Sequence, residues 1–249
     1  MLKVRVIPTL TIKNERLVKS VCFAEHRNIG SYISAVRVFN ARDVDELIFL
    51  DLDAATRGIQ SRVLQEVTKE CFMPVTLGGG VQTLEDIQLL LSSGADKVSL
   101  NTAALENPSL IEGAAAKFGN QCVVVSIDVR KTSRGYKVYG TGGTRESAKD
   151  PVEWARETEL RGAGELLLTS IDNDGVMEGY DTELIQMVSR AVKIPVIASG
   201  GAGIPLHCVE AVKSGASAVA AASIFQYTQT TPLLIKETLA SFGIPARIL

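Results

Sequence analysis

Short apolar runs rich in Val, Ile and Leu alternate along the chain with longer segments in which apolar residues recur at a helical period. The runs are nearly continuous, which is typical of parallel strands buried on both faces. Helical patterns follow most of them, for example at Thr83–Ser93, Pro108–Phe118 and Pro151–Arg161, and Tyr136–Tyr139 is predicted to form a small hairpin after the fifth run. The eight runs that we predict as strands are Lys3–Thr11, Glu46–Asp51, Pro74–Leu77, Lys97–Leu100, Cys122–Asp128, Glu165–Thr169, Pro195–Ala198 and Ala218–Ala221.

The two halves of the chain repeat the same features in the same order. MPVTLGGG at Met73 aligns with IPVIASGG at Ile194, and SGADKVSLN at Ser93 aligns with SGASAVAAA at Ser214, both at an offset of 121 residues. ELIFLDLD aligns with ELLLTSID at an offset of 119 residues. Eight strand–helix units arranged as a repeat of four predict an α/β fold: a single (β/α)8 TIM barrel domain over residues 1–249, built from homologous half-barrels at about 1–120 and 121–249.

The composition suits one ordinary globular domain, because 46% of the residues are hydrophobic and 22% are charged. The formal net charge of -2 gives no electrostatic reason to expect nucleic acid or an anionic membrane as a partner. No apolar stretch approaches the roughly 20 residues of a membrane-spanning helix, so we expect a cytoplasmic protein. The four cysteines are dispersed, and His26 is expected in the long loop after the first strand, far from His207. We therefore expect free thiols, no metal site and no cofactor.

Glycine-rich turns around Gly80 and Gly201 follow the third and seventh predicted strands. Each turn leads toward a helix whose first backbone amides can bind an anion. Asn101 and Thr102 follow the fourth strand, and Ser223 follows the eighth, as repeat-related polar groups beside these turns. We therefore predict one phosphate site in each half-barrel and an elongated ligand that carries two phosphates.

Polar and charged residues mark the two ends of the predicted strands. Asp128 ends the fifth strand, on the side where barrel enzymes place their active sites, whereas the repeat-related position of the first strand holds Thr11. Two cations and two anions at the opposite end could close the barrel floor as a ring of salt bridges; they are Arg5, Glu46, Lys97 and Glu165. The alternative is that these strand starts are charged only because they emerge into water.

Several long stretches match one protein family: DELIFLD, GGGVQT, GADKVSLNTAALENPSLI, VVVSID, GAGELLLTSIDNDG, GYDTELI and IPVIASGGAG. Through them the chain resembles, over nearly its whole length, the cyclase subunit of imidazole glycerol phosphate synthase, the HisF family. The resemblance implies a barrel that docks a HisH-like glutaminase at its amino-terminal face. It also implies that ammonia passes a gate at the four charged floor residues, that it travels through the lumen, and that Asp96 contacts the glutaminase.

Cyclisation in this family uses two aspartates as general acid and base, at the ends of the first and fifth strands. Asp128 matches the second, but Thr11 occupies the first position, and losing a positioned acid or base costs about 10²–10⁴ in rate. Lys19 matches a phosphate-side lysine in the family's mobile first loop. Asp174 and Gly175 match a turn after the sixth strand, which either contacts substrate or is a simple turn.

Some relatives that lack the first aspartate are similar to this chain in RVIPTL and in Val36–Asp51. They belong to surface-polysaccharide pathways, where a glutaminase and a third amidotransferase protein act with them to turn an acetamido group on a sugar into an acetamidino group. This resemblance gives our leading prediction, an ammonia-channelling subunit with an intact gate and a broken catalytic pair. Two alternatives stay open: a histidine-pathway cyclase that relocated its acid–base group to Asp51 or Asp174, and a non-catalytic scaffold or phosphometabolite sensor.

Overall fold

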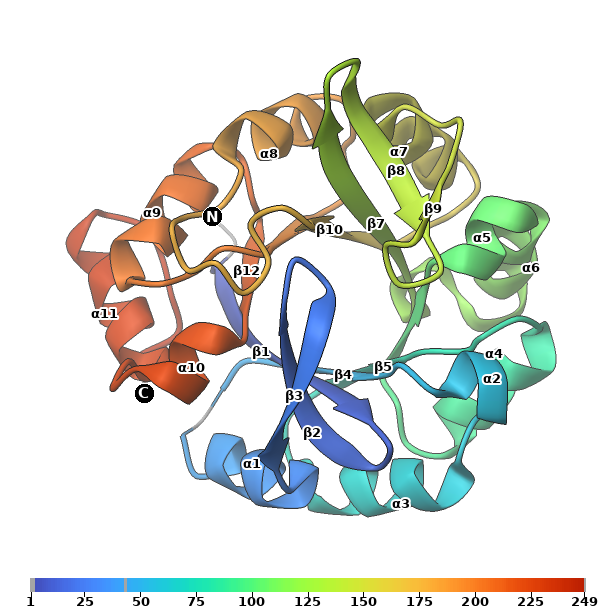
Figure 1. The fold of residues 1–249 in the computed structure, drawn as a ribbon, viewed down its shortest axis with the longest axis horizontal. Helices are drawn as coiled ribbons and strands as arrows, with labels where there is room; N and C mark the ends of the chain where they lie inside the picture. Colours follow the sequence, from blue (N-terminus) through green and yellow to red (C-terminus); the bar gives the residue numbers. More distant parts are fainter. Residues whose placement is uncertain (1–2, 43, 249) are drawn as a thin grey trace.

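Parallel strand pairing runs around a complete ring (Figure 1). The computed structural model describes residues 3–42 and 44–248. Within these residues the eight barrel strands are β1 (Arg5–Lys13), β4 (Leu47–Asp51), β5 (Val75–Gly78), β6 (Lys97–Leu100), β7 (Val123–Thr132), β10 (Glu165–Ser170), β11 (Val196–Ser199) and β12 (Ala218–Ala221). β1 lies between β12 and β4, and β7 closes the ring by pairing with β10. The predicted (β/α)8 barrel is therefore confirmed.

Helices surround the ring of strands on the outside (Figure 1). They are α1 (Tyr32–Asn40), α2 (Ala54–Arg57), α3 (Ser61–Glu70), α4 (Leu84–Ser92), α5 (Thr102–Glu106), α6 (Ser109–Phe118), the 3-10 turn η1 (Asn120–Cys122), α7 (Pro151–Leu160), α8 (Thr182–Ser189), α9 (Pro205–Lys213), α10 (Ser223–Tyr227) and α11 (Pro232–Ser241). Local signals set their starts: Thr83 and Asp86 form a capping box at α4, and Asp150 caps α7 in front of Pro151. No helix in the described part of the chain is long and apolar enough to cross a membrane.

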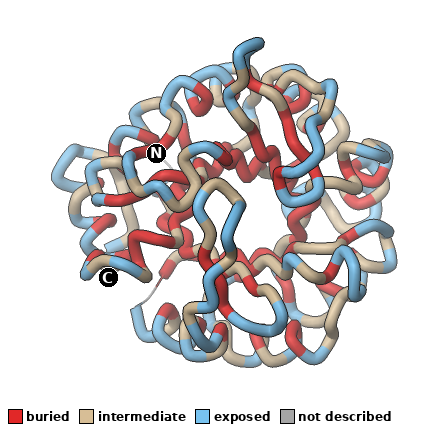
Figure 2. The backbone as a smooth tube through the Cα atoms, viewed as in Figure 1, coloured by how far each residue is buried: buried red, intermediate tan, exposed pale blue. Residues whose placement is uncertain are grey.

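The barrel strands are buried on both faces, which explains their continuous apolar sequences (Figure 2). One face packs under the helices, for example at Leu10, Phe49 and Leu168. The other face fills the lumen with a second apolar cluster: Ile7, Ile48, Val124, Leu167, Ile197, Ala218 and Ala220. Alternate residues of β1, from Arg5 to Thr11, therefore share the side of Ile7 that faces the lumen.

The segment after the first strand is a β-hairpin, so the prediction of a long loop there was wrong. β1 continues to Lys13, and β2 (Arg16–Val21) and β3 (Ala24–Gly30) follow as antiparallel partners. The two-residue turns are Asn14-Glu15 and Cys22-Phe23, and all four residues have positive φ. Such turns suit the twist of a hairpin, but glycine usually occupies them, so no hairpin is predicted here from the residues alone. Lys19 and His26 accordingly lie on strands.

The second insertion agrees with its prediction. β8 (Gly135–Gly140) contains Tyr136–Tyr139 and pairs antiparallel with the extended end of β7, and β9 (Arg145–Glu146) pairs with β8. Both hairpins stand at the carboxyl ends of the strands, where they cover part of the barrel mouth (Figure 1).

Backbone conformation repeats at the same offset of 121 residues as the sequence. Asn101, before α5, has φ -129° and ψ -90°, and Ala222, before α10, has φ -133° and ψ -67°. Thr83, before α4, has φ -131° and ψ 167°, and Ile204, before α9, has φ -136° and ψ 158°. These pairs support the division into half-barrels, which stays a prediction.

Candidate functional site

Asp128 occupies a buried position at the barrel mouth, at the carboxyl side of β7. Its two oxygens accept hydrogen bonds from Ser126 Oγ and Asn101 Nδ2, each at 3.2 Å. Burial raises the pKa of Asp128 from 3.8 to about 7; the Ser126 hydrogen bond opposes this rise, and the negative charge of Asp174 adds to it. A carboxyl group with a pKa near neutrality can both accept and donate a proton under physiological conditions.

Thr11 lies half-buried on the lumen side of β1, near the carboxyl ends of the strands. Below it on the same side is Thr9, whose Oγ1 is buried and has no hydrogen-bond partner among the residues that the structure describes. A threonine hydroxyl does not ionise near neutral pH, so Thr11 can position a group by hydrogen bonding but cannot act as a carboxylate base. The acid–base capacity of this side of the mouth must therefore come from other residues.

The β2–β3 hairpin brings a lysine into the mouth. Lys19 is only 9% exposed, and burial lowers its pKa from 10.5 to about 8, an effect that the charge of Asp174 opposes. Asp174 is itself affected, because burial raises its pKa while Lys19 lowers it. Asp174 is thus electrostatically coupled to both Lys19 and Asp128, and the three groups form one titrating cluster.

Asp51 and Asp174 are the two carboxylates considered as a relocated acid or base, and Asp51 does not point into the lumen. Burial raises its pKa, but its Oδ1 accepts the backbone amide of Asp53 at 2.9 Å. Leu50, the preceding residue, packs against the lumen cluster, so strand alternation directs Asp51 away from the lumen. Of the two candidates, Asp174 is the one placed beside Asp128.

The tip of the β2–β3 hairpin is docked on the turn after β10. Cys22 donates its backbone amide to the carbonyl of Asp174 at 2.8 Å, and Cys22 Sγ donates to the carbonyl of Asp172 at 3.3 Å. Gly175 has φ 76°, and a Cβ added there would lie 2.2 Å from the carbonyl oxygen of Ser20. Glycine at 175 is therefore required by the close approach of the hairpin.

The glycine-rich turns are also required for packing. At Gly79 and Gly201 an added Cβ would lie 2.0 Å from the carbonyl oxygens of Asp51 and Gly179, and at Gly80 it would lie 2.4 Å from the carbonyl carbon of Ala54. Each turn is thus pressed against the neighbouring strand–helix loop. This packing accounts for glycine without a ligand, so phosphate binding at Gly80 and Gly201 stays a prediction.

The polar residues predicted beside the turns have defined positions. Asn101 Nδ2 donates to the carbonyl of Ser126 at 3.0 Å as well as to Asp128, so it belongs to the Asp128 network. Thr102 Oγ1 donates to Asn101 Oδ1 and accepts the amide of Thr141, which ties α5 to the β8–β9 insertion. The repeat-related Ser223 is buried at the start of α10. Their proposed role in holding phosphate is not tested by these contacts.

At the opposite end of the barrel, the four charged floor residues contact one another in a ring. Arg5 binds Glu46 at 2.5 Å and Glu165 at 2.7 Å, and Lys97 binds Glu46 at 3.0 Å and Glu165 at 2.8 Å. The Glu46 side chain is only 3% exposed and also accepts from Thr76 Oγ1 at 2.9 Å. Burial alone would lower the pKa of Arg5, but the two glutamates raise it above its ordinary value. Because these four side chains pair with one another, they are not charged merely because the strands start in water.

Asp96 lies exposed beside this floor ring. Its Oδ2 accepts the backbone amide of Val75 at 2.8 Å, and its own amide donates to the Val75 carbonyl. The carboxylate is therefore fixed at the amino-terminal face, next to Lys97. Contact with a glutaminase at this point stays a prediction.

The sequence alone did not single out Thr169, which borders Asp128 in the register of β7 and β10 and whose side chain opposes the rise in the pKa of Asp128. A signal was present, because Thr169 has the same strand parity as Glu165, which was expected to face the barrel axis. The network that holds Asn101 against Asp128 had no comparable signal, since it depends on the conformation of the β6–α5 turn.

Comparisons with known proteins agree with the resemblance noted from the sequence. A family model described as histidine biosynthesis protein matches residues 5–231. A Campylobacter jejuni protein provisionally named imidazole glycerol phosphate synthase subunit hisF2 is 48% identical over 250 residues, covering 100% of this chain and 100% of that protein. The imidazole glycerol phosphate synthase subunit HisF from two strains of Caulobacter vibrioides is 48% identical over 253 residues, covering 100% of this chain and 97% of the relative.

Proposed function

The chain belongs to the histidine biosynthesis protein family, and on that premise we propose that it is the ammonia-receiving synthase subunit of a glutamine amidotransferase complex. It is similar over its full length to proteins named as imidazole glycerol phosphate synthase subunits. In the proposed complex a HisH-like glutaminase docks at the amino-terminal face, where Asp96 and the floor ring lie.

The barrel offers a physical basis for conducting ammonia rather than ammonium. The floor ring is closed by direct salt bridges, so passage requires one of them to part. Above the ring the lumen is lined by apolar side chains such as Ile7, Val124 and Ile197. An unpaired ammonium ion is expensive to place in such surroundings, whereas neutral NH₃ carries no charge to desolvate. Apolar walls also keep the nucleophile away from bulk water.

Thr11 is the single observation that carries our choice of ammonia acceptor. The family's cyclisation uses two carboxylates, and here one of the two positions holds a hydroxyl while Asp128 keeps a pKa of about 7. Half of an acid–base pair suits ammonia delivery better than ring closure. We therefore assign the ammonia to amidination of an acetamido sugar in surface-polysaccharide synthesis, with a third amidotransferase protein that activates the sugar.

The phosphate-binding residues keep a place in this proposal. In the proposed site, Gly80 and Thr102 of one half-barrel are related by the repeat to Gly201 and Ser223 of the other, and Asn101 stands beside Thr102. Lys19, Asp174 and Gly175 complete the set through the family resemblance. A phosphorylated small molecule bound there would cover the mouth and hold ammonia inside. The charge of the bound phosphate would act on the coupled pair Lys19 and Asp174.

A cyclase of histidine biosynthesis is the second candidate, favoured by the names of the relatives and by one feature of the site. Asp174 is half-buried and electrostatically coupled to Asp128, so it could supply the second proton-transfer group in place of Thr11. The two candidates differ in whether the mouth catalyses ring closure by itself.

Ammonia-dependent cyclisation of the bisphosphorylated histidine-pathway ribonucleotide distinguishes them. The proposal predicts that the wild type turns this substrate over about 10²–10⁴ times more slowly than Thr11→Asp does. Asp128→Asn in the Thr11→Asp background serves as the control, because it removes the remaining carboxylate and with it the recovered activity. Wild-type turnover that disappears in Asp174→Asn would instead establish the cyclase.

A further inference from the structure

The β7–β8 hairpin, which extends past the ring of strands, has two unlike faces (Figure 1). Val129 and Val138 are paired in its register, and both are buried in the apolar core under the helices. Because side chains alternate along a strand, the neighbouring register pairs lie on the other face, which Asp128 turns to the barrel mouth. The pairs of this face are Asp128 with Tyr139 and Arg130 with Lys137.

Arg130 and Lys137 place two like charges side by side on the mouth face of the hairpin. Residues directly opposite in an antiparallel pair have Cβ atoms about 4.5–5.5 Å apart, and like charges in such positions destabilise the pair. Both residues are half-buried, so water and salt screen the repulsion only in part. A negative group bound between the two side chains would remove this repulsion.

The guanidinium of Arg130 is held in one orientation. Its buried Nε lies 3.5 Å from Asp172 Oδ1, and Asp172 Oδ2 accepts the backbone amide of Lys131 at 2.7 Å. Its Cζ lies 5.3 Å from the centroid of the Tyr139 ring, whose hydroxyl donates to Glu146 at 2.9 Å. The terminal nitrogens of Arg130 make no hydrogen bond to the residues that the structure describes. A guanidinium fixed in this way is preorganised to bind two oxygens of one phosphate or carboxylate.

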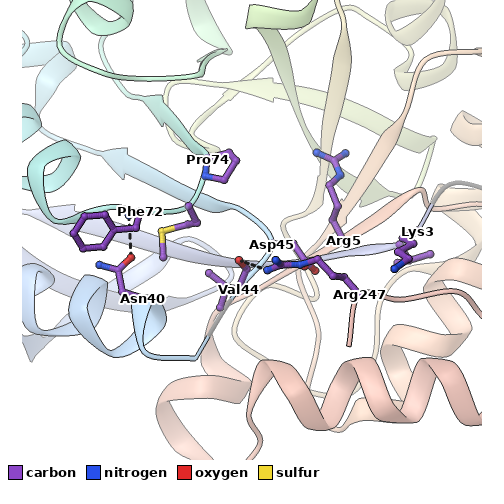
Figure 3. Close-up of a pocket in the computed structure, with 10 residues that line it drawn as sticks. Lys3, Arg5, Asn40, Val44, Asp45, Phe72, Pro74 and Arg247 are labelled. Carbon is purple, nitrogen blue, oxygen red and sulfur yellow. Dashed lines mark hydrogen bonds and ion pairs between the residues drawn. The ribbon is translucent and has the colours of Figure 1, made fainter. Parts of the chain in front are cut away.

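Lys137 has no carboxylate within ion-pair distance among the residues of the described ranges. Half-buried cations elsewhere are paired: Lys149 binds Glu157 at 2.5 Å, and Arg247 binds Asp45 at 2.9 Å at the amino-terminal face (Figure 3). A half-buried ammonium group without a counterion loses hydration that no ion pair replaces. This position therefore favours an anion that a ligand supplies.

We propose that Arg130 and Lys137 form an anion site that binds a phosphate or carboxylate group of the small molecule at the mouth. Arg130 donates hydrogen bonds from its two terminal nitrogens, and Lys137 supplies the second positive charge. The site lies one register pair beyond Asp128, about 7 Å along β7, and is separate from the glycine-rich turns after β5 and β11. This inference rests on the proposed function, because it specifies a further anionic group on the ligand of the same mouth.

Nuclear magnetic resonance of the full chain labelled with ¹⁵N tests the inference, with inorganic phosphate and acetate as the probes. Each anion replaces chloride at constant ionic strength and about pH 7.5, where phosphate is mainly a dianion. We expect the backbone amide signals of Val138 and Tyr139 to shift and to saturate. Arg130→Gln should raise the dissociation constant by about three- to tenfold, because one charged hydrogen-bond donor is lost.

Lys137→Glu separates binding from folding. It sets opposite charges across the register, so we expect a thermal midpoint at or above that of the wild type while the saturating shifts disappear. Lys131→Gln is the matched control. Lys131 lies on the opposite face of the same hairpin, where its Nζ pairs with Glu183 at 2.8 Å, so this variant keeps the wild-type dissociation constant.

Saturation by phosphate would assign a phosphate group to the site, and saturation by acetate alone would assign a carboxylate; both results support the inference. Hairpin amides that do not shift with either anion, or that shift equally in the wild type and Lys137→Glu, would overturn it. The amides of Gly80 and Gly201 report separately on the phosphate sites of the proposed function. Shifts there without shifts in the hairpin would overturn the anion site alone, whereas the proposed function is tested by the cyclisation assay, in which the hairpin is unchanged.

Discussion

Replacing Asp128 with Asn should stabilise the protein at pH 8 but not at pH 4. The pKa of Asp128 rises from 3.8 to about 7, chiefly through burial, so the folded state resists ionising this carboxyl group. Below pH 3.8 the group is protonated in both states and costs nothing. As the pH rises from about 4 to about 7, the unfolded state loses the proton first, and folding stability falls.

The size of the effect follows from the shift. A rise from 3.8 to about 7 corresponds to an upper limit of about 4 kcal/mol of stability lost above neutrality. Asn can keep the hydrogen bond from Asn101 on its oxygen and turn its amide toward Ser126, whose hydroxyl can accept as well as donate. We therefore expect about 2–4 kcal/mol of stabilisation at pH 8, which raises the thermal midpoint of a chain of this size by about 4–16 °C.

Thermal unfolding of both proteins from pH 4 to pH 8, followed by circular dichroism, measures this difference. Glu178→Gln is the matched control, because Glu178 is exposed in the turn after β10 and should show no pH-dependent difference from the wild type. A difference between Asp128→Asn and the wild type that stays constant across this pH range would refute the account of Asp128 as a buried group with a raised pKa.

Three other substitutions test separate parts of the structure by thermal unfolding. Glu46→Gln leaves the two cations of the floor ring with one carboxylate, so it should lower the free energy of unfolding by about 2–3 kcal/mol and the thermal midpoint by about 4–12 °C. The control Glu70→Gln, at a more exposed ion pair, should change the midpoint little. Equal midpoints for the two variants would contradict the floor ring. Gly175→Ala should destabilise by more than about 1 kcal/mol, because its Cβ would lie 2.2 Å from a carbonyl of the hairpin; wild-type stability would show that the hairpin is not docked there. Thr9→Val removes a buried hydroxyl that has no partner among the described residues and should stabilise the protein by about 1 kcal/mol. Thr158→Val breaks a 2.9 Å hydrogen bond and should destabilise it. A Thr9→Val protein less stable than Thr158→Val would contradict the assignment of these hydroxyls.

The barrel strands could be predicted because they are buried on both faces. Continuous apolar residues located Lys97–Leu100 and Ala218–Ala221 with the observed bounds. The β2–β3 hairpin could not be found in this way, since β3 is mostly exposed and has no apolar pattern. Its turns also rely on Cys22 and Phe23 in conformations that glycine normally supplies.

The candidate site was predictable where it depends on strand parity and less so where it depends on loops. The alternation of side chains along the strands predicted that Arg5 and Glu165 lie at one end of the lumen, and the structure shows them in contact there. The coupling of Lys19, Asp128 and Asp174 needed the fold, because it arises when the hairpin closes over the turn after β10. Burial, which sets these pKa values, is a property of the assembled mouth and not of any local sequence.

Conduction of ammonia through the barrel is tested by isotope competition in a complex reconstituted with the proposed glutaminase and amidotransferase. Glutamine labelled with ¹⁵N in its amide is supplied with excess unlabelled ammonium, and the acetamidino nitrogen of the sugar product is analysed by mass spectrometry. We expect the wild type to incorporate mainly ¹⁵N and Ala220→Leu, which enlarges a lumen side chain, to lose this preference. Wild-type product whose label matches the bulk ammonium pool would contradict transfer through the lumen.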